Sequence, residues 1–140
     1  MGMNDFVNSV DLLQRGMDVE TLRYQVSANN LANSEVPNYK SQSVNFESEL
    51  KRAYESRDND YDSFHLATTD SRHFQSEQPR DWRSVEPRRV TDYTTTSKAN
   101  GNNVDAEEEA MNVTKIQMQY RLLTQLQNFQ FNQIKIAMKK

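Results

Sequence analysis

The sequence predicts a mainly α-helical protein, in which long N- and C-terminal helices pair as a coiled-coil-like domain around an irregular middle segment with short strands. Apolar residues recur at alternating spacings of three and four near both ends of the chain, and neither stretch has an internal proline. Residues 41–99, by contrast, hold two of the three prolines and both histidines. We therefore divide the chain into residues 1–40, 41–99 and 100–140.

The first helix is predicted over about residues 4 to 33, a length of about 45 Å at 1.5 Å per residue. Its apolar positions follow the heptad spacing of a helix that packs lengthwise on a partner. Two positions of the same register, Glu20 and Ser27, are polar. The predicted seam consists of Met3, Phe6, Val10, Leu13, Met17, Tyr24 and Leu31.

The last helix is predicted to begin at Asp105, which forms a capping box with Glu108. The apolar arc that follows is too wide for a two-stranded coil, so a third surface is implied. Two interpretations stay open: an antiparallel hairpin closed by a long insertion, or a helix pair whose outer faces pack against neighbouring copies. The predicted seam is Val113, Ile116, Tyr120, Leu123, Leu126, Phe129, Ile134 and Ala137.

The middle segment differs in composition from both ends. Residues 54–62 are polar and predict an exposed loop. Residues 64–69 and 89–97 are rich in β-branched and aromatic residues, which favours short strands.

The composition indicates either that the apolar residues are concentrated in part of the chain or that the chain completes its core against other chains. Of its 140 residues only 35% are hydrophobic, and the mean hydropathy is -0.96, whereas ordinary globular domains are nearer half apolar. A net charge of -3 without a basic patch argues against a nucleic-acid partner. The apolar runs are too short for a helix that spans a membrane.

No group of residues predicts catalysis, a metal or a cofactor. Asp70, Ser71 and His73 are the residue types of a hydrolytic triad, but three sequence neighbours rarely converge in the geometry that a triad needs. His65 and His73 lack the spacing of a metal site. Three glycines in the whole chain leave no phosphate-binding loop. We expect a protein that is not an enzyme.

Two motifs resemble bacterial flagellar rod and hook proteins. SANNLANSEVPNYK, followed by VNFESEL at 44–50, resembles their N-terminal signature, a helix ending in ANN-[LI]-AN before a turn with proline and an aromatic residue. GNNVDAEEEAMNVTKIQMQYRLLTQL resembles the C-terminal helix of the proximal rod, or FlgB, type. This chain has Val36 and Asn38 where that family often has Thr and Gly, and we expect Asn38 to adopt the left-handed turn in place of Gly.

The resemblance implies a structural subunit whose terminal helices form a coiled inner domain. Subunits of this kind stack with helical symmetry into a hollow rod, with the middle segment further out. The implied partners are copies of the chain, other rod subunits, the junction protein that joins the rod to the membrane ring, and the export gate. The implied location is the periplasmic rod of the basal body, reached without a cleaved signal peptide. Another short rod subunit, or a monomeric helical-hairpin adaptor, remains an alternative.

The resemblance also directs attention to the asparagines at the end of the first helix. Ala28 and Ala32 leave room for a close helix approach, and we expect Leu31 to anchor in the pair. The asparagine amides can satisfy terminal carbonyls and the backbone of the next turn. The signature turn is Ala28, Asn29, Asn30, Ala32, Asn33, Pro37 and Tyr39. Phe6 and Val10 have the F-x-x-x-apolar form proposed for docking at the export gate.

Overall fold

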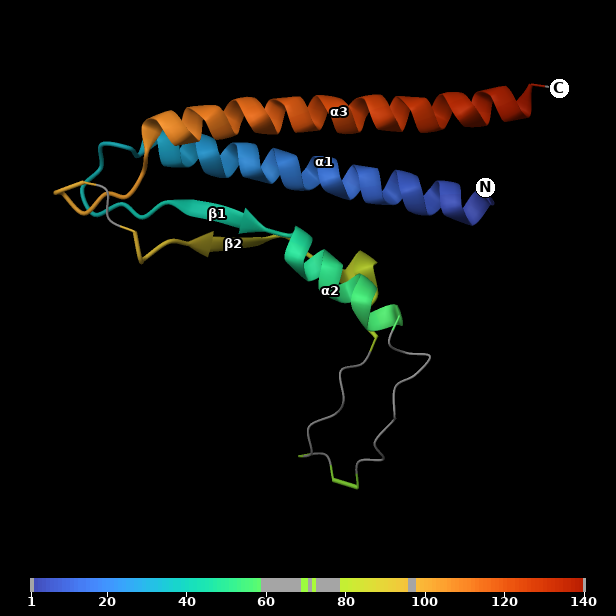
Figure 1. Ribbon diagram of the computed structural model, residues 1–140, viewed down its shortest axis with the longest axis horizontal. Coiled ribbons are helices and arrows are strands. Elements are labelled where there is room, and N and C mark those ends of the chain that lie inside the picture. Colours follow the sequence, from blue (N-terminus) through green and yellow to red (C-terminus); the bar gives the residue numbers. More distant parts are fainter. Residues whose placement is uncertain (1, 59–68, 71, 73–78, 96–97, 140) are drawn as a thin grey trace. The chain divides into compact units, whose positions relative to one another are not determined.

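The computed structural model describes residues 2–58, 69–70, 72, 79–95 and 98–139. Two long terminal helices pack together and a short two-stranded sheet lies between them in sequence, which confirms the predicted fold class (Figure 1). The chain divides into two compact units. We call residues 1–44 with 89–140 the helix-pair unit, and residues 45–88 the middle unit.

The two long helices begin and end close to where the sequence predicted. Helix α1 spans Met3–Ala32 and helix α3 spans Ala106–Met138. The Asp105 carboxylate accepts hydrogen bonds from the backbone N–H groups of Glu107 and Glu108, which confirms it as the N-cap of α3. The helices run antiparallel and side by side, so the two ends of the chain lie at the same end of the pair (Figure 1).

Contacts between α1 and α3 are distributed along the whole pair. Near the chain ends, the rings of Phe6 and Phe131 meet edge to face with centroids 6.0 Å apart. In the middle, Gly16 lies so close to Leu123 that a Cβ on Gly16 would stand 3.3 Å from a Leu123 methyl carbon. The absence of a side chain at Gly16 therefore lets the helices approach closely.

A second face of α1 packs on the sheet. Strand β1 (Gln42–Asn45) pairs with β2 (Arg88–Thr91), and the arrows run in opposite directions (Figure 1). Arg23 donates to the Val44 carbonyl oxygen at 3.5 Å, and Asn30 bonds to Gln42. Val19 and Val26, both buried, share this side of α1 by their spacing. Helix α1 therefore carries two packed stripes where the sequence predicted one.

The predictions for the middle segment had mixed outcomes. Strand β2 lies within residues 88–91 and overlaps the strand predicted at 89–97. The strand predicted at 64–69 falls almost wholly outside the described residues, and Thr69 is a bend. The exposed loop predicted at 54–62 is wrong over residues 54–58, which belong to α2 (Glu47–Asp58); residues 59–62 are not described.

Helix α2 forms because its polar residues pair at helical spacing and its apolar face has a partner. Lys51 and Glu55 lie within 3.6 Å, and Arg52 bonds to Glu49 at 3.3 Å. Trp82, in the short 3-10 helix η2 (Trp82–Ser84), stacks on the ring of Tyr54 at 6.0 Å. The core of the middle unit consists of Phe46, Ala53, Trp82 and Val85.

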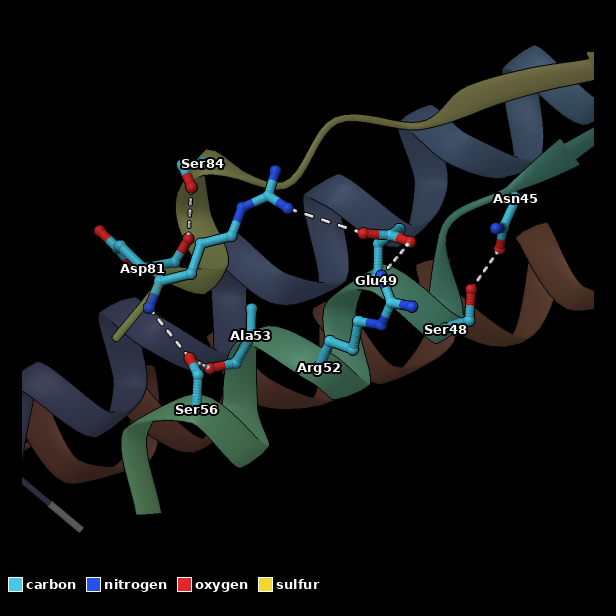
Figure 2. A network of polar contacts seen from close by, with 9 residues as sticks. Asn45, Ser48, Glu49, Arg52, Ala53, Ser56, Asp81 and Ser84 are labelled. Carbon is cyan, nitrogen blue, oxygen red and sulfur yellow. Dashed lines mark hydrogen bonds and ion pairs between the residues drawn. The ribbon is translucent and has the colours of Figure 1, made fainter. Parts of the chain in front are cut away.

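Polar contacts fasten the segment before η2 to α2. The Ser56 hydroxyl accepts a hydrogen bond from the Arg80 backbone N–H at 2.9 Å. The same hydroxyl donates to the Ala53 carbonyl (Figure 2). The Arg80 guanidinium lies 3.6 Å from the Glu49 carboxylate. At the start of α2, the Ser48 hydroxyl donates to Asn45.

Candidate assembly site

Asn30 is the centre of a polar cluster at the end of the helix pair where the chain leaves α1 and enters α3. We call this the closed end of the pair. The Asn30 side-chain NH₂ donates to the Gln42 carbonyl at 2.8 Å and to the Glu109 carboxylate at 2.9 Å. Its side-chain oxygen accepts from the Gln42 N–H at 3.0 Å and from the Tyr39 hydroxyl at 3.2 Å. All four hydrogen-bonding positions of the amide are therefore filled. Asn30 joins α1, the turn, β1 and α3 in one place.

Two asparagines donate hydrogen bonds to carbonyls at the end of α1 and in the turn after it. Asn33 donates from its side chain to the Asn29 carbonyl at 2.7 Å. Asn102, which is fully buried, donates to the carbonyls of Asn33 and Val36 at 2.9 and 2.7 Å. The carbonyls of Asn33 and Val36 lie beyond the last residue of α1, where helical hydrogen bonds no longer supply a donor. These hydrogen bonds also tie the exit from α1 to the segment that leads into α3.

Further hydrogen bonds join the turn after α1 to residues 98–103. Asn103 accepts from the Ser41 N–H at 2.7 Å and donates to the Asp92 carbonyl at 2.8 Å. The ammonium groups of Lys40 and Lys98 donate to the carbonyls of Gly101 and Ser34. We call this set of contacts around Asn30, Asn102 and Asn103 the asparagine knot.

Two residues with left-handed backbone conformation lie where the turn after α1 meets residues 98–103. Asn38 has a φ of 60°, which confirms the left-handed turn predicted for it, and Gly101 has a φ of 81°. The Asn38 N–H donates to the Asn100 carbonyl at 3.0 Å. A Cβ on Gly101 would come within 2.5 Å of the Asn38 side-chain oxygen. Gly101 is therefore required both for its backbone conformation and for its lack of a side chain.

Burial changes the acidity of the tyrosine in the knot. Burial and, to a smaller degree, the negative charge of Glu109 raise the pKa of Tyr39 above its ordinary value. The Tyr39 hydroxyl therefore stays protonated, and able to donate to Asn30, to a higher pH than an ordinary tyrosine.

The sequence identified only half of this knot. Asn30, Asn33 and Tyr39 were predicted from the signature turn, but Leu31, expected to anchor in the pair, is 38% exposed, and Asn30 is buried in its place. Asn102, Asn103 and Glu109 were not selected. The available signal was a pair of asparagines directly before a helix cap, since such residues compete for backbone hydrogen bonds.

The predicted seam residues occupy three kinds of environment. Ile116 is buried between the helices. A second group is partly buried along the pair: Phe6, Val10, Leu13, Met17, Val113, Leu123 and Ile134. The third group is exposed on the isolated chain: Met3, Tyr24, Leu31, Tyr120, Leu126, Phe129 and Ala137.

Between α1 and α3 lies an open groove of about 450 Å³. We call it the helix-pair groove. Tyr24 and Tyr120, each 44% exposed, stand at its sides. The residues that line it are Glu20, Thr21, Tyr24, Ile116, Gln117, Tyr120, Arg121, Thr124 and Gln125.

The outer side of α3 carries a row of exposed apolar residues. Their spacings of seven and four place them on one face of the helix. Between 55% and 72% of each of these residues is exposed. We define the outer stripe as Met111, Met118, Leu122, Phe129 and Ile136.

The residues considered for catalysis or metal binding do not form a site in the described part of the chain. Asp70 bonds to Arg72, which lowers the pKa of its carboxyl group. Ser71, His65 and His73 lie outside the described residues. Among the residues that the structure describes, no cluster of three metal-ligating side chains occurs, and no helix is long and apolar enough to cross a membrane.

No family model matches the sequence. Similarity to curated proteins is extensive. A protein of Borreliella burgdorferi named flagellar basal body rod protein FlgB is 37% identical over 137 residues, which cover 98% of this chain and 100% of that protein. The chain belongs to the FlgB family of flagellar basal-body rod proteins.

More distant FlgB proteins match over nearly the same extent. The FlgB of Bacillus subtilis is 27% identical, with 97% of each chain covered. The FlgB of Aeromonas hydrophila is 25% identical, covering 96% of this chain and 95% of the relative. These matches extend over the parts of the chain that form both helices and the knot. Membership of the FlgB family makes this chain a component of the flagellar rod.

Proposed function

We propose that this FlgB-family chain is a structural subunit of the proximal rod, which assembles with helical symmetry into a hollow drive shaft. The observation that carries the proposal is the outer stripe of α3, because an apolar row of this length on a soluble helix needs a covering surface. A single chain buries few apolar residues in its helix-pair unit: Val19, Val26, Val104 and Ile116. Neighbouring subunits would supply the remaining core.

The helix pair and the knot have different roles in this proposal. The predicted seam residues that are exposed on one chain, such as Tyr24, Tyr120 and Leu126, would contact neighbouring subunits. The asparagine knot would fix the direction in which the chain leaves α1, with Pro37 and Tyr39 holding the exit. The partners would be copies of the chain, other rod subunits, and the junction protein that joins the rod to the membrane ring.

Deleting the gene and restoring it on a plasmid tests the rod function. The deletion strain should be non-motile and its basal bodies should end at the membrane ring in electron cryotomograms, while the wild-type plasmid restores rods. A chain with Asn30→Ala and Asn33→Ala should restore rods poorly. Intact rods in the deletion strain would remove the proposal.

Export through the flagellar secretion apparatus without a cleaved signal peptide is part of the same proposal, with Phe6 and Val10 as the residues that contact the export gate. Phe6 packs on Phe131 in the folded pair, so it is free for such a contact only while the chain is unpaired.

The matched variants Phe6→Ala and Phe131→Ala separate export from folding, because each removes one half of the same ring contact. Loss of secretion from Phe6→Ala alone supports docking at the gate. Equal secretion by both variants would exclude a special role of Phe6 in export.

A further inference from the structure

Asn100 is an asparagine of the kind that most readily loses its side-chain amide. It is followed directly by Gly101, the only one of the three glycines that follows an asparagine. Asn100 is exposed and lies in the segment of the asparagine knot that leads into α3. Asparagine is a thermally labile residue, and a following glycine, which has no Cβ, leaves its own main-chain nitrogen unshielded. The position therefore combines an exposed amide with an open nucleophile.

The reaction that removes this amide requires only the chain and water. The main-chain nitrogen of Gly101 forms a bond to the side-chain carbon Cγ of Asn100 and loses its proton, while Asn100 Nδ2 leaves as ammonia. The product is a five-membered succinimide ring. Water that opens the ring at Cγ gives aspartate. Water that opens it at the main-chain carbonyl gives isoaspartate, in which the main chain runs through Cβ and Cγ.

In the folded chain, hydrogen bonds hold both ends of the peptide group between Asn100 and Gly101. Its carbonyl oxygen, on Asn100, accepts from the Asn38 N–H at 3.0 Å. Its N–H, on Gly101, donates to the Lys98 carbonyl at 3.2 Å. The Asn100 side-chain oxygen also accepts from the Asn102 N–H at 3.1 Å. Because ring formation removes the proton that Gly101 donates to Lys98, the closed knot opposes the reaction.

Isoaspartate at residue 100 does not fit the closed knot. It adds one carbon to the main chain before Gly101, so Gly101 must move. A Cβ on Gly101 would already come within 2.5 Å of the Asn38 side-chain oxygen, and the Gly101 carbonyl accepts from the Lys40 ammonium group at 2.7 Å. These contacts leave no space for a longer main chain. Aspartate, by contrast, keeps the length of the main chain and an oxygen that accepts from the Asn102 N–H.

We propose that Asn100 is a site of spontaneous deamidation, which the closed asparagine knot protects and the open chain exposes. Conversion to isoaspartate then prevents the knot from closing again. Because the reaction needs no other protein, it is independent of the rod function. Closure of the knot, which joins the end of α1 to the start of α3, therefore decides whether a chain stays unmodified.

Peptide mapping of the full-length chain measures the reaction. The chain is incubated at one alkaline pH, either folded in buffer or unfolded in guanidinium chloride, and then digested with trypsin. Trypsin cleaves after Lys98 and Lys115, so residues 99–115 form one peptide. Conversion at Asn100 should be at least about tenfold slower in the folded chain, because the reaction then waits for local opening. A sample digested before incubation measures the conversion that occurs during digestion.

The same peptide contains its own controls. Asn102, Asn103 and Asn112 are followed by asparagine or valine, whose side chains shield the next nitrogen, so they should convert much more slowly in the unfolded chain. Electron-transfer fragmentation assigns the change to a residue and distinguishes isoaspartate from aspartate. Asn100→Gln should nearly abolish conversion at this position, because a glutamine would have to form a six-membered ring.

A variant that opens the knot separates its protection from that of folding in general. Asn102→Ala removes two hydrogen bonds to the turn after α1 and should raise the conversion of Asn100 in buffer toward the rate in guanidinium chloride. Asn29→Ala, at an exposed position, is the matched control and should leave the rate low. If Asn102→Ala loses its helices in circular dichroism, Lys40→Met, which removes only the donor to the Gly101 carbonyl, replaces it.

Refolding tests the effect of isoaspartate. Chains converted in guanidinium chloride are separated by chromatography and refolded. The isoaspartyl chain should unfold at a lower urea concentration than the Asn100→Asp variant, which has the same added charge without the longer main chain.

Four results would overturn the proposal. The first is equal conversion of Asn100 in the folded and unfolded chains. The second is conversion of Asn100 no faster than that of the other asparagines in the unfolded peptide. The third is a knot variant, with its helices intact, that converts as slowly as Asn29→Ala. The fourth is an isoaspartyl chain as stable as Asn100→Asp.

Discussion

The side-chain amide of Asn30 on α1 donates a 2.9 Å hydrogen bond to the carboxylate of Glu109 on α3, across 79 residues of sequence. The same amide pairs with both backbone groups of Gln42. A single buried side chain therefore joins the two helices and the strand. Directional hydrogen bonds therefore help to hold the closed end of the pair.

Replacing Asn30 with alanine should lower the free energy of unfolding by about 3 kcal/mol, because several buried groups lose their partners at about 1–3 kcal/mol each. Urea unfolding of the purified chain, followed by circular dichroism at 222 nm, measures the change. Asn29→Ala is the matched control and should cost much less, since Asn29 is exposed. Equal losses for the two variants would contradict a special role of Asn30.

Tyr39→Phe should destabilise the protein by about 1 kcal/mol at neutral pH through the lost hydrogen bond to Asn30. Because folding raises the pKa of Tyr39, the folded chain holds this proton more tightly than the unfolded chain. The contribution of Tyr39 is therefore complete below its unfolded pKa and is lost as the pH rises through the folded pKa. The difference between wild type and variant should shrink above about pH 10, and a constant difference in alkaline urea titrations would argue against the linkage.

Gly16→Leu should weaken the helix pair by about 1–3 kcal/mol, because a side chain at Gly16 meets Leu123. Gly16→Ala should have a small net effect, since higher helix propensity, about 1 kcal/mol, offsets a slight shift of the half-buried Leu123 side chain. Adding Leu123→Ala to Gly16→Leu should recover part of the loss in thermal unfolding. If the loss of stability in the double variant equals the sum of the losses in the two single variants, the two residues do not interact.

Trp82→Ala should unfold or loosen the middle unit, since Trp82 is 2% exposed and its loss removes the stack on Tyr54. Truncation of a buried tryptophan costs about 3–5 kcal/mol. In amide NMR spectra, signals of residues 45–58 and 79–88 should collapse while those of α1 and α3 persist. Tyr93→Ala, at an exposed site, should change neither set, and loss of the helix signals with Trp82→Ala would show that the two units unfold together.

The sequence alone determined both long helices, the cap at Asp105 and the left-handed turn at Asn38, because periodicity, capping and turn conformation are set by neighbouring residues. It also indicated the family, through the two terminal motifs. It did not reveal α2, because the ring of Tyr54 in that helix stacks on Trp82, 28 residues later. Only the tertiary structure decided that Val19 and Val26 pack toward β1 and that Asn102 satisfies the end of α1. Those contacts join distant segments, and the geometry of approach between such segments is absent from any local pattern.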